Sequence, residues 1–244
     1  MTAPTRKLEA YRYADVAALA SVWSELAQPE QIEIAANQKM RQIWLPSADA
    51  VQVRRVEIAL GAGATANIFA LNTATTYGRI EIDVTLGDGA HFGLDAANIG
   101  GGNSTLEIVT VVRHIGVAAT SRQTIRSVLG GTATGSYLGK VAVARGAQQT
   151  DSVQSVKAML LDRGATANAK PELEIYADDV KCAHGATVGE LDAEQLFYAA
   201  ARGLDPAAAR ALLLEGFVAG LWSDIDGDDQ GIAELARAAL KGVA

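Results

Sequence analysis

The chain is poor in cysteine and in aromatic residues. It has one cysteine, Cys182, and aromatic residues make up 5% of its 244 residues. One thiol cannot close an internal disulfide, so a disulfide-stapled fold is excluded. With so few aromatic rings, the interior has to be built from Val, Ile, Leu and Ala. Hydrophobic residues make up 49% of the sequence, which predicts a folded globular protein.

Long apolar runs and basic clusters are also missing. No stretch of about 18 apolar residues occurs, so no membrane-spanning helix is expected. The first residues lack the apolar core of a signal peptide, and we therefore expect a cytoplasmic protein. The net charge is −7 and no basic stripe stands out. Nucleic acid and anionic membrane surfaces are consequently not expected as partners.

The middle of the chain, residues 37–190, has the pattern of β-strands. Residues 51–58, 79–86 and 105–112 alternate Val or Ile with polar residues, as strands with one buried face do. Helix-forming windows are nearly absent between residues 50 and 190, which argues against an α/β fold. This part is predicted to be an all-β core.

Short glycine–alanine corners separate the predicted strands. Glycine supplies the left-handed backbone that a tight corner needs, and a small alanine fits inside a narrow, stacked coil. Stacked coils of a parallel β-helix and two packed sheets both fit this pattern. The corners are Gly63-Ala64, Gly89-Ala90, Gly146-Ala147 and Gly164-Ala165.

Helical patterns occupy the two ends of the chain. In residues 1–36, Asp15 is expected to cap an amphipathic helix that ends near Pro29. Residues 191–244 are predicted to form three helices, with start signals at Asp192 and Asp205.

The second C-terminal helix has an apolar stripe that includes Leu212, Leu213 and Phe217. Helices at the end of a β domain must bury their apolar faces against something. Part of this surface could therefore belong to a partner protein.

One segment brings together the two side chains best suited to a soft metal. Cys182 and His184 lie two residues apart in a predicted strand, so both leave the same face with Cα atoms about 6.6 Å apart. Lys181 is expected to lower the pKa of the thiol. An iron–sulfur cluster takes about four ligands, so a second chain or a thiol cofactor would have to complete the site. The alternative is a buried structural cysteine beside a capping histidine.

The same segment resembles the SufB/SufD family of scaffold subunits for SUF iron–sulfur cluster assembly. The run Asp178-Asp-Val-Lys-Cys182-Ala-His184-Gly185 is similar to the SufD branch, whereas the SufB branch carries a Glu-His-Glu-Ala-Thr type of run. The resemblance is strong over residues 120–225 and holds over residues 50–120 in pattern only. It also includes Gly139-Lys-Val, Gln149-Thr-Asp151, Gln154-Ser155, Gln195-Leu-Phe-Tyr198 and Arg202-Gly203-Leu204.

The resemblance implies a mainly β fold: a right-handed parallel β-helix core with a short N-terminal helix and a C-terminal helical subdomain. It implies a non-catalytic scaffold subunit that works with a SufB-like subunit and a SufC-like ATPase. A transient iron–sulfur cluster would form at the junction with the SufB-like subunit, at His184 and, as a second candidate, Cys182. The ATPase is expected on the C-terminal helices, at Leu213, Phe217 and Leu221. Many members have a longer N-terminal helical region than this chain.

Two other functions stay open at this point. One is a polysaccharide-active enzyme on a β-helix, which would need Asp, Arg and Lys along a groove. The other is a purely structural β-helix with an inert Cys182. A homodimer through an exposed β edge is a further possibility for the chain alone. The sequence has no glycine-rich phosphate loop with a lysine, so the ATPase must be another chain.

Overall fold

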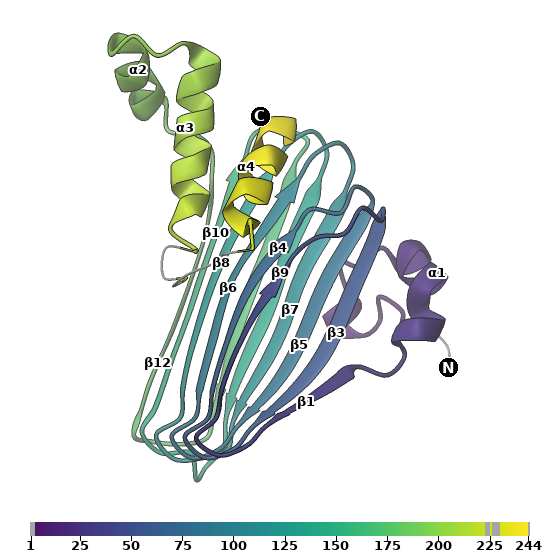
Figure 1. The fold of residues 1–244 in the computed structure, drawn as a ribbon, viewed down its shortest axis with the longest axis vertical. Coiled ribbons are helices and arrows are strands. Elements are labelled where there is room, and N and C mark those ends of the chain that lie inside the picture. The colour runs from purple at the N-terminus through teal and green to yellow at the C-terminus, as the bar shows by residue number, and fades with distance from the viewer. Residues whose placement is uncertain (1–2, 223–224, 226–229, 244) are drawn as a thin grey trace.

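The computed structural model describes residues 3–222, 225 and 230–243. Its core is a β-solenoid of six coils, and each coil contributes one strand to each of two sheets (Figure 1). Odd-numbered strands form sheet A, in the order β1-β3-β5-β7-β9-β11, and even-numbered strands form sheet B, in the order β12-β10-β8-β6-β4-β2. The predicted mainly β chain with a parallel β-helix core is confirmed.

All strand pairings are parallel, and the predicted strands at 51–58, 79–86 and 105–112 are present as β3, β5 and β7. Sheet A contains β1 (Glu30–Ile34), β3 (Val51–Leu60), β5 (Tyr77–Leu86), β7 (Thr105–His114), β9 (Thr134–Val143) and β11 (Thr166–Ile175). Sheet B contains β2 (Lys39–Trp44), β4 (Thr65–Asn72), β6 (His91–Gly100), β8 (Thr120–Leu129), β10 (Thr150–Leu160) and β12 (Val180–Gly189).

The solenoid begins earlier in the chain than residue 37. Strand β1 pairs with the second half of β3, so part of residues 1–36 belongs to the first coil. The boundary between the β core and the helical part at residue 190 stays a prediction.

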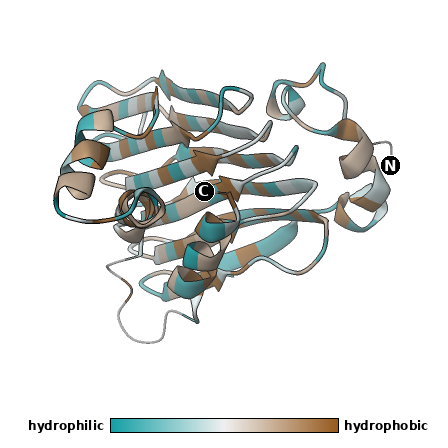
Figure 2. Cartoon of the chain, turned by 90° about the horizontal axis from the view of Figure 1, so that it is seen from above, coloured by the Kyte–Doolittle hydropathy of each residue, from teal (hydrophilic) through white to brown (hydrophobic). Residues whose placement is uncertain are grey.

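The interior is filled by one face of every strand. Parallel pairing in register stacks equivalent residues from coil to coil, as in the column of Ile58, Val84, Val112 and Val141. Each of these side chains is at most 2% exposed, and burying one contributes about 1.5–3 kcal/mol. The bands of alternating hydropathy along the strands are visible in Figure 2. Branched aliphatic residues therefore supply the core, as the scarcity of aromatic residues predicts.

One corner of the solenoid is a column of residues in the left-handed backbone conformation. Asn37, Gly63, Gly89, Ala118 and Gln149 have φ between 55° and 65°. Each of their N–H groups donates to a carbonyl of the next coil, at 2.6–2.8 Å. The predicted glycine conformation is confirmed at Gly63 and Gly89 and is wrong at Gly146 and Gly164, whose φ is not positive. At the other coils, residues with a Cβ occupy the same strained conformation.

The alanines of these corners point inward. Ala64, Ala90, Ala119 and Ala147 are fully buried. The expectation that small alanines fit a narrow, stacked coil is confirmed.

The N-terminal segment packs on the outer face of sheet A. It contains the 3-10 helix η1 (Glu9–Tyr11) and α1 (Val16–Leu26). Asp15 caps α1 as predicted, since its carboxylate accepts hydrogen bonds from the N–H groups of Ala17 and Ala18, each at 3.0 Å. Trp23 of α1 forms a buried cluster with Tyr77 of β5.

A buried ion network fixes this segment to the sheet. The fully buried guanidinium of Arg79 lies 2.8 Å from Glu81 and 3.0 Å from Glu107. It also donates to the carbonyl of Ala10 at 2.8 Å and lies over the ring of Tyr11. Burial alone lowers the pKa of Arg79, but the two carboxylates outweigh burial and raise the pKa. The charge is therefore paired and hydrogen-bonded, as a buried charge must be.

The helices α2 (Ala193–Ala201), α3 (Pro206–Ala219) and α4 (Ile232–Val243) follow the solenoid. Asp192 and Asp205 cap α2 and α3 as predicted. Helix α4 and the end of α3 pack on the outer face of sheet B, whereas α2 and the start of α3 extend beyond it (Figure 1). No described helix is both long and apolar enough to cross a membrane.

The buried face of α3 differs from the predicted stripe. Leu214 and Val218 are buried against the solenoid, whereas Leu212 is 56% exposed. Three consecutive leucines allow the helical pattern to be read in two registers. Packing against sheet B selects the register that contains Leu214.

Candidate functional site

Cys182 and His184 lie on β12, the last strand of the solenoid. Within the described residues, β12 pairs only with β10, and β11 pairs only with β9. Both strands therefore leave one edge free at the same end of the molecule. This open end also exposes Ile175, Tyr176 and Val188. The two candidate ligands thus lie where another chain can reach them.

The two candidate ligands leave the same face of β12, which confirms the predicted extended conformation. Cys182 is half-buried and packs against the core. His184 is exposed, and its ring makes no hydrogen bond with the residues that the structure describes. In register below them on β10 lie Ser152 and Gln154, respectively. Their role as ligands stays a prediction.

The thiol does not have the pKa expected from the sequence. Burial raises the pKa of Cys182, and the nearby Asp151 raises it further, while a hydrogen bond from the backbone of Ser152 lowers it in part. Lys181 does not lower the pKa because consecutive strand residues point to opposite faces. The predicted activation of the thiol by Lys181 is therefore wrong for this chain alone.

A column of polar side chains leads from the interior to Cys182. On the first coils the corresponding position is apolar, as at Phe92, but Ser121 and Ser152 occupy it on β8 and β10. The Ser121 hydroxyl lies 2.9 Å from Nε2 of His114 and 2.8 Å from the Ser152 hydroxyl. Burial lowers the pKa of His114 to about 4. The neutral imidazole of His114 is thus connected by hydrogen bonds through Ser121 to Ser152, which lies in register beneath Cys182.

A second polar column leads to His184. It consists of Gln123 on β8 and Gln154 on β10, which succeed Leu94 on β6. Oε1 of Gln123 accepts hydrogen bonds from Thr110 at 2.6 Å and from Tyr137 at 3.1 Å. Gln154 is 1% exposed, and neither Oε1 nor Nε2 of its amide has a partner among the described residues. In these two columns the buried polar residues lie on β8 and β10, the strands that precede β12 in sheet B.

The chain supplies few metal ligands. No group of three or more His, Cys, Asp and Glu side chains that could hold a metal ion occurs in the described part of the chain. Cys182 and His184 alone therefore make at most part of a site for an iron–sulfur cluster.

Exposed apolar residues gather on the two helices that extend from the solenoid. Phe197 and Tyr198 of α2 are 76% and 61% exposed, and Leu212 of α3 is 56% exposed. With the half-buried Leu213, they line a hollow of about 960 Å³. We call these four residues the α2–α3 apolar surface. Exposed aromatic rings on a short helix are typical of a docking surface.

The other predicted partner-binding residues lie elsewhere. Phe217 is half-buried, and the guanidinium of Arg126 on β8 lies 5.9 Å from the centre of its ring. Leu221 is 4% exposed and packs against α4. Of the three residues chosen from the sequence, only Leu213 belongs to the α2–α3 apolar surface. Phe197 and Tyr198 were not predicted to bind a partner, although two adjacent aromatic residues in a nine-residue helix were a usable signal.

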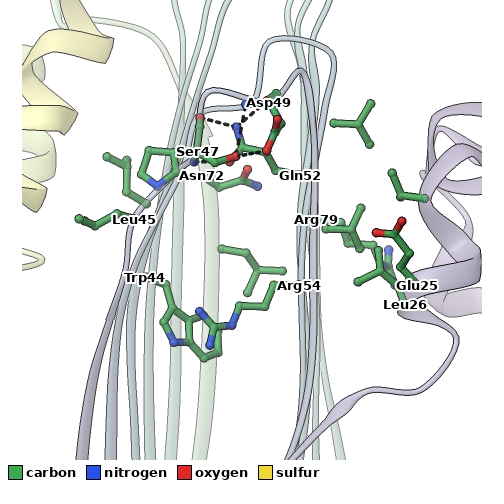
Figure 3. Close-up of a pocket in the computed structure, with 16 residues that line it drawn as sticks. Glu25, Leu26, Trp44, Leu45, Ser47, Asp49, Gln52, Arg54, Asn72 and Arg79 are labelled. Atoms are coloured by element: carbon green, nitrogen blue, oxygen red, sulfur yellow. Dashed lines mark hydrogen bonds between the residues drawn. The ribbon is translucent and has the colours of Figure 1, made fainter.

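A separate cavity of about 590 Å³ lies near the N-terminal end of the solenoid (Figure 3). It forms because β1 pairs only with the second half of β3 and leaves the first half uncovered. Arg54 stacks on Trp44 in its wall, and Gln52 is hydrogen-bonded to Ser47. Its lining contains neither cysteine nor histidine. The cavity is therefore distinct from the site at Cys182 and His184.

Comparison with known proteins places these features in a family. The model described as "SUF system FeS cluster assembly, SufBD core domain" matches residues 28–217. The "Iron-sulfur cluster assembly protein SufD" of Escherichia coli is 35% identical over 137 residues, which cover 55% of this chain and 32% of the relative. The protein of the same name in Bacillus subtilis is 28% identical over 165 residues, or 68% of this chain and 36% of the relative.

A chloroplastic protein of Arabidopsis thaliana named ABCI7 is 51% identical over 79 residues, which cover 32% of this chain and 17% of the relative. The matched part is thus about a third or less of each of these relatives. The family model, in contrast, covers all the described solenoid strands from β1 to β12 as well as α2 and most of α3. The chain belongs to the SufBD family of the SUF iron–sulfur cluster assembly system.

Proposed function

We propose that the chain is a non-catalytic scaffold subunit on which an iron–sulfur cluster is assembled. The observation that carries this proposal is the position of Cys182 and His184 on the last strand of an open-ended solenoid. A ligand set that is incomplete and lies at a free edge suits a site shared between two chains. The cluster is cargo in this scheme: it forms on the scaffold and is passed on.

The second chain is a SufB-like subunit that docks at the open end. Its strands would extend the sheets along β11 and β12, whose outer edges are free within the described residues. Such docking would cover Ile175, Tyr176 and Val188 and would place the partner's ligands near His184. In isolation, the same edges would support a homodimer.

A SufC-like ATPase is the third component, and we place it on the α2–α3 apolar surface. The helices that carry this surface extend beyond the solenoid (Figure 1), and Phe197, Tyr198 and Leu212 are each more than half exposed. ATP-driven movement of the ATPase would pull on α3. Phe217 and Arg126 link α3 to β8, the strand beside β10, so the pull would reach the coils beneath the ligands. We expect this assembly to work in the cytoplasm.

Co-expression with a SufB-like and a SufC-like protein, followed by size-exclusion chromatography with mass detection, tests the proposal. We expect a complex with one copy of this chain. A chain that stays alone or pairs only with itself would contradict the scaffold function and leave a purely structural solenoid. Activity on an acidic polysaccharide would instead indicate the β-helix enzyme, which family membership does not favour.

A further inference from the structure

Gln154 is a buried side chain whose amide makes no hydrogen bond with the residues that the structure describes. Its amide is 1% exposed, and both Oε1 and Nε2 are without partners among the described residues. An unsatisfied buried amide destabilises a fold, whereas an apolar side chain of similar volume at the same place would not. Two coils earlier the same column holds Leu94, which shows that an aliphatic residue fits such a position. Something other than stability must account for the amide.

The neighbours of Gln154 within sheet B are few. Its strand lies between β8 and β12, so the residues in register with it are Gln123 and His184. Oε1 of Gln123 already accepts two hydrogen bonds, whereas its Nε2 has no partner among the described residues. His184 lies on the next coil, about 4.8 Å away along the stack, and its side chain leaves the same face. Its imidazole makes no hydrogen bond within the described chain.

We propose that Gln154 is a positioning residue for His184. Its amide oxygen accepts a hydrogen bond from one ring N–H, so the lone pair of the other ring nitrogen faces the open end. This fixes the tautomer that can bind a metal, in the way that outer hydrogen bonds orient histidine ligands. The functional consequence rests on the proposed role of His184 in cluster assembly, but the hydrogen bond itself does not.

The neighbouring column provides an internal contrast. Ser152, which lies in register with Cys182, is already hydrogen-bonded to Ser121. Gln154 therefore differs from Ser152 on the same strand in having its whole hydrogen-bonding capacity available for the last coil.

The test is the tautomer of His184 in the full chain labelled with ¹⁵N-histidine, at a mildly alkaline pH where imidazole is neutral. The chain has three histidines, so signals are assigned with His91→Gln and His184→Gln. We expect wild type to show one dominant tautomer at His184 and Gln154→Leu to show averaged ring nitrogen shifts. Gln123→Leu, one coil deeper on the same face, is the matched control and should leave His184 as in wild type. A mixed tautomer in wild type, or an unchanged one in Gln154→Leu, would overturn the inference.

Thermal unfolding separates positioning from support of the fold. Loss of the proposed hydrogen bond and removal of a buried amide act in opposite directions, so the Tm of Gln154→Leu should change by less than about 4 °C. A lower Tm with an unchanged tautomer would mean that Gln154 only supports the fold, and the inference would be wrong. If Gln154→Leu fails to fold, the unbranched Gln154→Met takes its place in both measurements.

Cluster formation in cells distinguishes this inference from the proposed function. If Gln154→Leu frees the tautomer and also lowers the iron content of the complex by about 10-fold or more, as loss of an outer hydrogen bond does at other metal sites, both are supported. If the ring nitrogen shifts of His184 become averaged in Gln154→Leu while cluster formation stays normal, Gln154 positions His184, but His184 is not a ligand.

Discussion

Two buried polar side chains at the two ends of the solenoid, Arg79 and Gln154, differ in how they are bonded. Near the N-terminal segment, Arg79 is fully buried and is held by Glu81, Glu107 and the backbone of η1. Near the open end, Gln154 is equally buried and has no partner within the described chain. The Arg79 guanidinium thereby fixes one part of the molecule to another, although Oε1 of Glu107 has no partner among the described residues. The unpartnered amide of Gln154 lies in register with His184 on the last coil instead.

The difference also appears in what covers each end. The N-terminal segment packs on sheet A through α1 and η1. In the first coil, the short strand β1 pairs only with the second half of β3. The last coil ends in β11 and β12 with free edges among the described residues. The N-terminal end is therefore covered by the chain's own helices, whereas the last coil keeps two free strand edges within the described residues.

The largest effect is expected at Arg79. Arg79→Met leaves Glu107 as a buried charge without its partner, so the free energy of unfolding should fall by about 3–5 kcal/mol. Urea denaturation measures the loss. Arg113→Met, which removes an exposed ion pair with Asp83, is the control and should cost less than about 1 kcal/mol. If both variants lose a similar amount of stability, the buried ion network contributes no more than an exposed ion pair.

Acidification should next weaken the interior near the open end. Because the pKa of His114 is about 4 in the folded chain and 6.5 ordinarily, the unfolded chain binds more protons between these values. Stability is therefore full above pH 6.5 and falls as the pH drops towards 4, by about 3 kcal/mol from this group. Denaturation at a series of pH values should show a shallower slope for His114→Gln. Parallel curves for the two proteins would rule out His114 as the source.

Protonation of Glu81 should also lower the free energy of unfolding, but at a lower pH than protonation of His114. Burial alone raises the pKa of Glu81, but Arg79 and Arg55 outweigh burial and lower it below 4.5. Its contribution is present above pH 4.5 and is lost as the pH falls further. The His114→Gln variant should thus retain the acid loss below pH 4.5, which separates the two groups.

The α2–α3 apolar surface should control retention of the ATPase. Phe197→Asp should reduce co-purification of a SufC-like protein by at least about 10-fold, since central aromatic residues dominate docking energies. Because Phe197 is 76% exposed, stability should change by less than about 0.5 kcal/mol. Leu235→Asp, an exposed change on α4, is the control. Loss of the ATPase with Leu235→Asp but not with Phe197→Asp would move the docking site to α4.

The smallest effect is expected in the corner column. Ala118 has φ of 55° and Gly89 has φ of 62° at equivalent positions of successive coils. Ala118→Gly should stabilise the chain by about 1 kcal/mol, and Gly89→Ala should destabilise it by about the same amount. A Cβ at Gly89 would meet no atom within 4 Å, so the backbone conformation alone decides. Thermal unfolding measures both effects. If each variant is as stable as wild type, the backbone at this corner can change its conformation without cost.

Local rules predicted most of the fold. Alternation of apolar and polar residues located β3, β5 and β7, and the aspartates at positions 15, 192 and 205 marked the starts of α1, α2 and α3. These features depend on residues close together in the chain. The resemblance of the segment around Cys182 then identified the family, which the family model confirms.

What the sequence did not reveal depends on register between coils. Arg79 and Glu107 are opposite each other on β5 and β7, and Gln154 lies beneath His184 only because β10 and β12 pair in one register. Strand β1 is too short for its pattern to stand out, and the three leucines of α3 left its buried face ambiguous. The thiol pKa was misjudged because a sequence neighbour was treated as a spatial one.

The most direct test of the account is the iron and sulfide content of the anaerobically purified complex with Cys182→Ser and His184→Ala, each compared with wild type. We predict that both variants assemble with the SufB-like and SufC-like subunits as wild type does, because neither residue holds the solenoid together. We also predict that the cluster content falls sharply, most of all for His184→Ala. An intact complex with wild-type cluster content in both variants would contradict the claim that the open end carries part of the ligand set.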